Sequence, residues 1–400
     1  MTATHRLTVV EPRQEDVAMR LALVSICLLW AGLVGNAVAM DDSGLAQQLV
    51  RGLNGDVNGG LNGKRADTCL AVAVVDRAQV AHTYWCGSGR QDTRINDHTA
   101  FEIGSISKTM TAALLADLIN QGKASLDDPL SAYLPPGTPV PAFQGQAIRL
   151  RHLVTHFSGL PAQATRMAPA DPRNPYADID ERVLLASLAD VRLTSPPGTR
   201  FEYSTLGYML LSYAVAHRAG TDFETLARKR LFTPIGMRNA YVTQAPAGIH
   251  KAAGHNEGRA IPEWTFPTDL SGTGGVRATL PDMVRYLQAQ LGQIDSAIGS
   301  ALTLSQQRLA IEPDVGMGWF LIQARGRVVH THDGGTGGFS SVMLFDRNAQ
   351  RGVVILSDTA WTPQIGITEL GLHLLDLGPA PGRSQDAPRV VTPWVRKLPL

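Results

Sequence analysis

Ser105 and Lys108 have the residue types and the spacing that could do chemistry. They form an S-x-x-K pair in FEIGSISKTM (101–110), at the start of a predicted helix. A spacing of three residues places the hydroxyl and the amine on one helical face. The helix start also leaves backbone N–H groups free beside Ser105. A lysine can take the serine proton only where burial or nearby positive charge lowers its pKa, and S-x-x-K alone occurs in many proteins.

Tyr203 lies just before a second predicted helix, in PPGTRFEYSTLGYMLL (196–211). A phenol held near ammonium groups can lose its proton more easily and can then act as a general base or acid. The alternative is a tyrosine whose ring packs on the helix. Without a partner motif, that alternative is the better interpretation.

A glycine-rich segment, HTHDGGTGGFSS (330–341), leads directly into a predicted strand. Glycines at this point let the backbone approach a ligand closely, with N–H groups facing a carbonyl oxygen; a loose turn is the alternative. His332 could donate a hydrogen bond there or lie on the surface. His330 and His332 could suggest a metal, but no acidic or cysteine partner stands at a convincing spacing, so we expect no metal.

Two cysteines, Cys69 and Cys86, remain once Cys27 is assigned to an apolar amino-terminal segment. They flank two β-type runs in CLAVAVVDRAQVAHTYWC and lie symmetrically about its polar turn. In a hairpin they would face each other. A cross-strand disulfide is plausible in an oxidising compartment, and two buried free thiols are the alternative.

Residues 45–378 form the working region of the chain. Strand patterns occur at both of its ends, with helical patterns between them. The predicted strands and helices are 68–87, 105–122, 207–219, 340–345, 351–356 and 363–377. We therefore predict a mixed α/β (α+β) fold, in which one sheet is built from both ends and packed by terminal helices. The mixed domain comprises 45–105 and 260–378, the inserted helical domain comprises 106–259, and 379–400 is a Pro-rich tail.

The amino terminus has the pattern of a secretory signal. Residues 20–39, RLALVSICLLWAGLVGNAVA, join one basic residue to an apolar run and a small-residue cleavage site, which predicts cleavage near Ala39. The apolar run is short for a membrane span, and an uncleaved anchor is the alternative. Residues 1–18 are polar and precede Met19, which could be the true start. We therefore take 1–39 as a signal peptide.

Composition narrows the classes of function. The chain has 400 residues, 44% of them hydrophobic and 18% charged, which is typical of a globular protein with more than one core. The formal net charge is +1, and acids and bases are mixed along the sequence. This balance argues against a basic surface that binds nucleic acid.

The order of the three motifs resembles that of the serine β-lactamase and DD-peptidase superfamily, whose members carry S-x-x-K, Y-x-N and K-T-G or H-x-G. The resemblance is to its class C branch with the AmpH-type low-molecular-weight penicillin-binding proteins. Further segments carry it: LDDPLSAYLPP (126–136), HLVTHFSGLP (152–161), LFTPIGM (231–237), GTGGVRATLPDM (272–283) and GMGWF (316–320). It implies a β-lactamase/transpeptidase-like fold, with an antiparallel sheet, an inserted all-helical region and the active site between them.

The resemblance also implies roles for individual residues. Ser105 would attack a carbonyl and become acylated, while Lys108 and Tyr203 would share the proton transfers. The N–H groups of Ser105 and Gly335 would form the oxyanion hole. His332 would take the place of the lysine of K-T-G.

This sequence departs from the family pattern at two positions that bear on substrate. Thr205 stands where Y-x-N has its amide, and Asp333 stands where a hydroxyl residue helps to hold the substrate's carboxylate. An ionised aspartate pointing there would repel that carboxylate. Thr336 or Arg277 could compensate, and Gly334 is a further substrate-binding candidate.

We therefore expect an exported, periplasmic serine hydrolase that acts on D-alanyl peptides of peptidoglycan or on β-lactams, without a cofactor. An esterase or a D-amino-acid aminopeptidase on the same scaffold is the second hypothesis. A binding or sensor protein that no longer turns substrate over is the third. The expected partners are a small-molecule or peptide substrate, with peripheral membrane contact at most and no nucleic acid.

Overall fold

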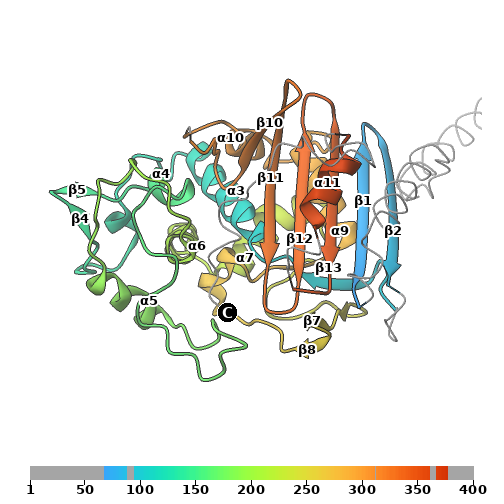
Figure 1. Ribbon diagram of the computed structural model, residues 1–400. Helices are drawn as coiled ribbons and strands as arrows, with labels where there is room; N and C mark the ends of the chain where they lie inside the picture. Colours follow the sequence, from blue (N-terminus) through green and yellow to red (C-terminus); the bar gives the residue numbers. More distant parts are fainter. Residues whose placement is uncertain (1–66, 88–93, 311, 361–365, 377–400) are drawn as a thin grey trace, which may run out of the picture. The chain divides into compact units, whose positions relative to one another are not determined.

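The computed structural model describes residues 67–87, 94–310, 312–360 and 366–376 (Figure 1). All of them belong to one compact unit, Asp42–Leu400. The predicted signal peptide 1–39 and the Pro-rich tail 379–400 lie outside the described residues. The division into a mixed domain and a helical domain stays a prediction.

The main sheet has six antiparallel strands in the order β10-β11-β12-β13-β1-β2 (Figure 1). These strands are β1 (Cys69–Asp76), β2 (Gln79–Cys86), β10 (Phe320–Ala324), β11 (Arg327–Gly335), β12 (Ser340–Asp346) and β13 (Arg351–Ser357). The pairing of β1 with β13 joins the two ends of the working region in one sheet, as the strand pattern predicts.

The main sheet has a hydrophobic core on each face. Successive side chains of a strand point to opposite faces, so alternate residues join different cores. In β12, Val342 and Leu344 pack with the terminal helix α11 (Ile367–Leu374), whereas Met343 and Phe345 join the larger core on the other face. That larger core includes α9 (Leu280–Gln290) and α3 (Ile106–Asn120). The sheet thus lies between α11 and the helices that carry the site (Figure 1).

The middle of the chain is mainly helical. Its further helices are α4 (Leu150–Val154), α5 (Glu181–Ser187), α6 (Thr205–Ala219), α7 (Phe223–Ala227), α8 (Thr233–Ile235) and α10 (Gly299–Ser305), with 3₁₀ or π turns at Leu130–Tyr133, Leu188–Asp190, Arg228–Phe232 and Thr268–Thr273. The helices α3 and α6 stop where predicted, before Gly122 and Gly220, which both have positive φ. The helix α6 begins at Thr205, two residues before the predicted start, because Ser204 caps its Gly207 N–H.

The inserted region 106–259, for which the sequence predicts helices alone, also contains short strands. They are β4 (Ala142–Phe143) with β5 (Gln146–Ala147), and β6 (His250–Lys251), β7 (Gly254–Asn256) and β8 (Arg259–Ile261); β3 (Thr99–Glu102) pairs with β6 and with β9 (Arg277–Thr279). The β4–β5 hairpin turns at Gln144 and Gly145, which both have positive φ. Two-residue loops of this kind join adjacent strands of a hairpin. The strands β4 and β5 have two residues each, which is too short to show a strand pattern in the sequence.

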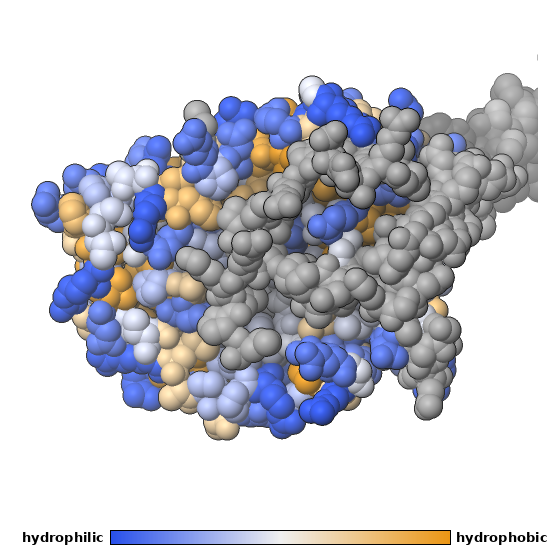
Figure 2. Space-filling model, in the orientation of Figure 1, coloured by the Kyte–Doolittle hydropathy of each residue, from blue (hydrophilic) through white to orange (hydrophobic). Residues whose placement is uncertain are grey.

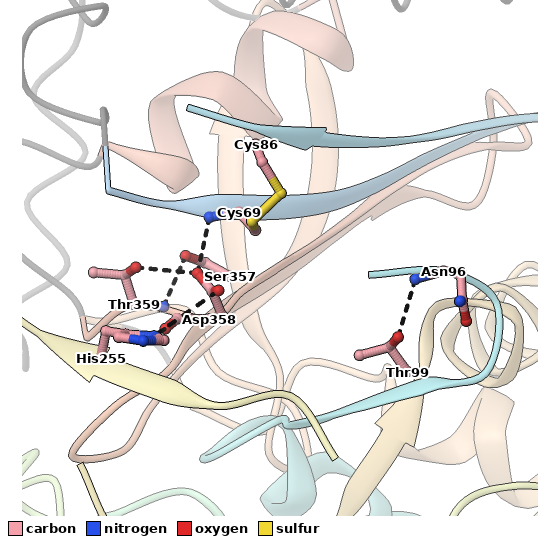
Figure 3. Close-up of a disulfide and its surroundings, with 8 residues drawn as sticks. All are labelled: Cys69, Cys86, Asn96, Thr99, His255, Ser357, Asp358 and Thr359. Carbon is pink, nitrogen blue, oxygen red and sulfur yellow. Dashed lines mark hydrogen bonds and ion pairs between the residues drawn. A yellow bond between two sulfur atoms is a disulfide. The ribbon is translucent and has the colours of Figure 1, made fainter. Parts of the chain in front are cut away.

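The two cysteines lie directly opposite each other at the open ends of β1 and β2, joined by an S–S bond (Figure 3). Their Cα atoms are 4.1 Å apart. The Cys69 N–H donates to Asp358 Oδ1 at 2.8 Å, and the His255 N–H donates to the Asp358 carbonyl at 2.9 Å. The disulfide therefore links the two strands of the first hairpin, and Asp358, which follows β13, ties that hairpin to β7.

The surface mixes polar and apolar residues. Figure 2 shows hydrophilic residues over much of the described part of one face, with hydrophobic residues between them, a mixture that is normal for folded proteins. Within the described ranges, no helix is long and apolar enough to cross a membrane.

Candidate active site

Ser105 caps the amino terminus of α3 and is accessible while its surroundings are buried. From residue 99 to residue 118 it is the only residue that is not buried. A serine at this position usually caps the helix through its hydroxyl, but here no side-chain capping bond forms. The hydroxyl therefore remains available to another partner.

That partner is Lys108, one helical turn further on. Its Nζ lies 3.0 Å from Ser105 Oγ and 2.7 Å from the Thr273 carbonyl oxygen, and the residue is only 1% exposed. Burial lowers the pKa of Lys108 to about 7, because a desolvated ammonium ion loses its hydration. A large fraction of the amine is thus neutral near pH 7 and can accept the serine proton.

Tyr203 lies just before α6, with Lys108 Nζ 5.1 Å from the centre of its ring. Burial raises the pKa of Tyr203 above its ordinary value, and a hydrogen bond with Ser105 opposes that shift. Burial therefore acts against the easier loss of the phenol proton that nearby ammonium groups could give. Lys108 is itself partly neutral, so Tyr203 keeps its proton and can donate it.

The glycine-rich end of β11 lies against the backbone that enters α3. A Cβ on Gly104, which has φ +50°, would come 2.6 Å from the Gly335 nitrogen. A Cβ on Gly334 would come 2.0 Å from the Ile103 carbonyl oxygen. Only glycine permits this approach, which brings Gly335 beside the nucleophile.

The N–H group of Gly335 points away from β12. The Thr336 N–H donates to the Phe339 carbonyl at 3.0 Å, and Gly335 pairs with Ser340 at the next position. Antiparallel pairs alternate between hydrogen-bonded and non-hydrogen-bonded, so the Gly335–Ser340 pair is of the second kind. Its N–H is free to meet a carbonyl oxygen on the side of Ser105.

His332 is neutral and fully buried, on the face of β11 that lies toward Tyr203 and Phe320. Burial, and then the charge of Lys108, lower the pKa of His332 to about 3. Its Nδ1 lies 2.6 Å from the Asp333 carbonyl oxygen, so Nδ1 carries the proton and Nε2 is an acceptor. This histidine supplies no positive charge to the site near neutral pH.

Asp333 faces the other side of the sheet. Thr368 Oγ1, on α11, donates to Asp333 Oδ2 at 3.3 Å. Burial raises the pKa of Asp333 to about 7, and the hydrogen bond from Thr368 partly opposes this. The carboxyl therefore lies against α11, on the opposite face of β11 from His332.

Arg277 is already engaged elsewhere. Its guanidinium donates to the Val242 and Trp264 carbonyls and pairs with Glu102 Oε1 at 3.6 Å and Glu263 Oε2 at 3.3 Å. It is 6% exposed. These bonds leave it poorly placed to hold a substrate carboxylate, so the compensation that the sequence suggested for Arg277 is not present in this conformation.

Thr205 and Thr336 are both almost completely buried. Thr205 is the first residue of α6, and its carbonyl accepts from Thr273 Oγ1 at 3.3 Å. Thr336 is 9% exposed, and its hydroxyl opposes the rise in the pKa of Glu102, whose main cause is burial. The structure thus brings Lys108, Tyr203, His332 and Gly335 together around the start of α3, with the Asp333 carboxyl behind β11.

Three residues near the site were missed by the sequence analysis. The His156 ring stacks on Tyr203 with centroids 4.1 Å apart. Tyr176 helps to raise the pKa of Tyr203, after the larger effect of burial. Gln163 Nε2 donates to the Tyr176 hydroxyl at 3.0 Å. His156 and Gln163 lie in or next to the segment HLVTHFSGLP, so that segment was the available signal.

No metal centre is evident in the described part of the chain, where no three His, Cys, Asp or Glu side chains cluster suitably. His330 Nε2 contacts the Gln306 carbonyl at 3.1 Å instead. The arrangement of an activated serine, a lysine of lowered pKa and a free backbone N–H suits acyl transfer.

The β-lactamase family model matches residues 47–371 of this chain. The chain belongs to the β-lactamase family. It is 30% identical, over 294 residues, to D-alanyl-D-alanine-carboxypeptidase/endopeptidase AmpH of Escherichia coli K12, which covers 69% of this chain and 75% of the relative. It is 27% identical, over 332 residues, to a β-lactamase of the same strain, which covers 72% and 83%.

Solved structures of the β-lactamase family share the fold. A class C β-lactamase superposes with a TM-score of 0.71 and 22% identity, over 86% of this chain and 99% of that one. The predicted fold, with its antiparallel sheet and flanking helices, is confirmed. As a member of the β-lactamase family the chain is a serine hydrolase, and the resemblance to AmpH-type proteins drawn from the motifs is confirmed.

Proposed function

We propose that Ser105 is the nucleophile of an acyl-transfer site, with Lys108 as its general base. The observation that carries the proposal is the 3.0 Å contact between Lys108 Nζ and Ser105 Oγ, at an amine whose pKa burial lowers to about 7. Neutral Lys108 takes the serine proton as Oγ attacks the carbonyl carbon. The Thr273 carbonyl holds the resulting ammonium in place.

The remaining steps use the backbone and Tyr203. The N–H groups of Ser105 and Gly335 stabilise the oxyanion, where one such donor is typically worth about 3 kcal/mol of barrier. Protonated Tyr203 gives its proton to the leaving group and recovers one from Lys108. Water then attacks the acyl-enzyme, and the proton transfers run in reverse.

The substrate class is D-alanyl peptides of peptidoglycan, β-lactams, or both. The printed activities of the relatives support it, since one is a D-alanyl-D-alanine carboxypeptidase/endopeptidase and another a β-lactamase. The signal pattern supports export to the periplasm with cleavage near Ala39. The disulfide is consistent with an oxidising compartment.

A second candidate is an esterase or a D-amino-acid aminopeptidase. Three observations favour it: His332 is neutral, Arg277 is held by carbonyls and glutamates, and the carboxyl of Asp333 lies close behind β11. A site with no free cation attracts a terminal carboxylate weakly. Substrates without that carboxylate would suffer no such loss.

The experiment that tests the proposal compares four substrates on the purified protein: a D-Ala-D-Ala peptide, a fluorescent penicillin, a short-chain ester and a D-amino-acid amide. The Ser105→Ala variant is the control. Ser105-dependent peptide cleavage or penicillin turnover supports the first function, whereas ester or D-amino-acid amide hydrolysis without peptide cleavage supports the second. A penicillin adduct that forms but never hydrolyses would point instead to a binding or sensor protein.

A further inference from the structure

His156 has an unusual backbone conformation beside the site. It follows α4 by two residues, is 1% exposed and has φ +63°. Few residues other than glycine adopt this left-handed region, and they keep it only where the surroundings hold them there. The contacts of His156 show what the conformation achieves.

Those contacts enclose Tyr203 from three directions. The Glu202 N–H donates to the His156 carbonyl at 2.8 Å, and the Ser204 N–H donates to His156 Nδ1 at 3.1 Å. The imidazole itself stacks on the Tyr203 ring, with centroids 4.1 Å apart and planes inclined by 27°. One residue thus fixes the backbone on both sides of Tyr203 and one face of its ring.

The His156 ring lies close enough to Lys108 to sense its charge, without adding a charge of its own. Burial first, and then Lys108 and His332, hold the pKa of His156 far below its ordinary value, so the ring is neutral. The rings of Tyr208 and Phe320 lie on the imidazole at centroid distances of 4.8 and 6.4 Å. Lys108 Nζ lies 5.7 Å from the centre of the Tyr208 ring, so these rings take part in burying the amine.

We propose that His156 is a positioning residue that aims the Tyr203 hydroxyl at Ser105 and keeps Lys108 dry. This inference rests on the proposed function of the site. His156 touches no reacting atom and acts through Tyr203 and Lys108. Its left-handed backbone is the means by which one residue can reach Glu202, Tyr203 and Ser204 together.

Two variants separate the contacts. His156→Asn keeps a side-chain acceptor and tolerates the left-handed backbone but removes the ring, whereas His156→Phe keeps a ring and leaves the Ser204 N–H unpaired. We expect each to lower the acylation rate, by up to about 10²-fold, with little change in KM, because the reacting groups lose alignment. We also expect the rising limb of the pH–rate profile to move to higher pH, because water raises the pKa of Lys108.

The matched control is His152→Asn. The Nδ1 of His152 also accepts a backbone N–H, that of Arg149, at 3.1 Å in the same segment, but His152 contacts no site residue. Its rate and pH profile should match those of the unchanged protein. Circular dichroism and thermal melting establish that each variant is folded, and the Asn variant carries the test if the Phe variant does not fold.

The outcomes are distinguishable. A folded His156→Asn protein that acylates at the original rate with an unshifted pH profile overturns the positioning role and leaves the proposed function intact. An unchanged protein that forms no adduct at Ser105 overturns the proposed function instead.

Discussion

Lys108 is basic enough to take a proton and neutral enough to be ready, because it is almost completely buried. No acid forms an ion pair with it among the described residues, and burial is the cause of its lowered pKa. His332, at the position where the family has a second lysine, is neutral as well. Among the described site residues, Lys108 is therefore the cation whose charge changes near neutral pH.

We expect the rate of acylation to rise with pH through a midpoint near pH 7, because only neutral Lys108 accepts the serine proton. Below the midpoint the rate should fall about tenfold per pH unit. Lys108→Met should lower the rate by roughly 10²- to 10⁴-fold, the usual worth of a general base. Adduct formation measured by mass spectrometry at several pH values checks this, with exposed Lys123→Met as control; a flat profile would exclude Lys108 as the base.

Asp333 should tune the choice between charged and uncharged substrates. Its carboxyl lies behind β11 against α11, but its pKa is raised to about 7, so above that pH its negative charge acts through the strand against a substrate carboxylate. The ratio of kcat/KM for a free-carboxylate peptide to that for an ester should therefore fall as pH rises through 7. The same ratio should not depend on pH in Asp333→Asn. If both proteins give the same pH dependence, Asp333 does not act on substrate choice.

At the scale of elements, the contact of β11 with the entrance of α3 positions the site. The sequence allowed the order of the motifs and the approach of a glycine-rich backbone to be predicted, since glycines before a strand are a local signal. The strand pattern of the sequence also implies that His332 and Asp333 point to opposite faces of β11, since neighbours in a strand alternate, so both could not face the nucleophile. The raised pKa of Tyr203 and the packing of His156 against its ring depend on burial by segments distant in sequence. No local sequence pattern predicts such burial.

Gly334→Ala should separate these two elements. Its Cβ would come 2.0 Å from the Ile103 carbonyl and 2.3 Å from Ser341 Oγ, so β11 must shift. We expect a destabilisation of about 1–3 kcal/mol and loss of acylation. A Cβ on neighbouring Gly335 meets nothing within 4 Å, so the melting temperature of Gly335→Ala should stay unchanged. Equal melting temperatures for all three proteins would contradict the close approach.

Reduction of the disulfide should destabilise the fold without touching the site. The bond closes a segment between residues 17 positions apart, for which the chain-entropy estimate is about 3 kcal/mol. Unfolding by denaturant with and without a reductant should show a lower midpoint in the reductant. A Cys69→Ser, Cys86→Ser double variant is the control, and its midpoint should ignore the reductant. An unchanged midpoint for the original protein would argue against the bond.

At the scale of the whole molecule, the prediction of the fold succeeded because strands lie at both ends of the working region. The pairing of β1 with β13 brings them together, and the helices between them carry Lys108 and Tyr203 to one end of the sheet. The short strands inside the helical region could not be predicted, because two-residue strands have no periodicity. Substrate choice is decided by a few side chains around that common frame, as is usual for one fold with several functions.

The most direct test of the account is the identity of the acylated residue. The purified protein would be incubated with a fluorescent penicillin and, separately, with an activated ester, followed by intact-protein mass spectrometry and peptide mapping. The account predicts one adduct, on Ser105, that is absent from a folded Ser105→Ala variant. A folded protein that forms no adduct with either reagent, or that carries the adduct on another residue, would contradict it.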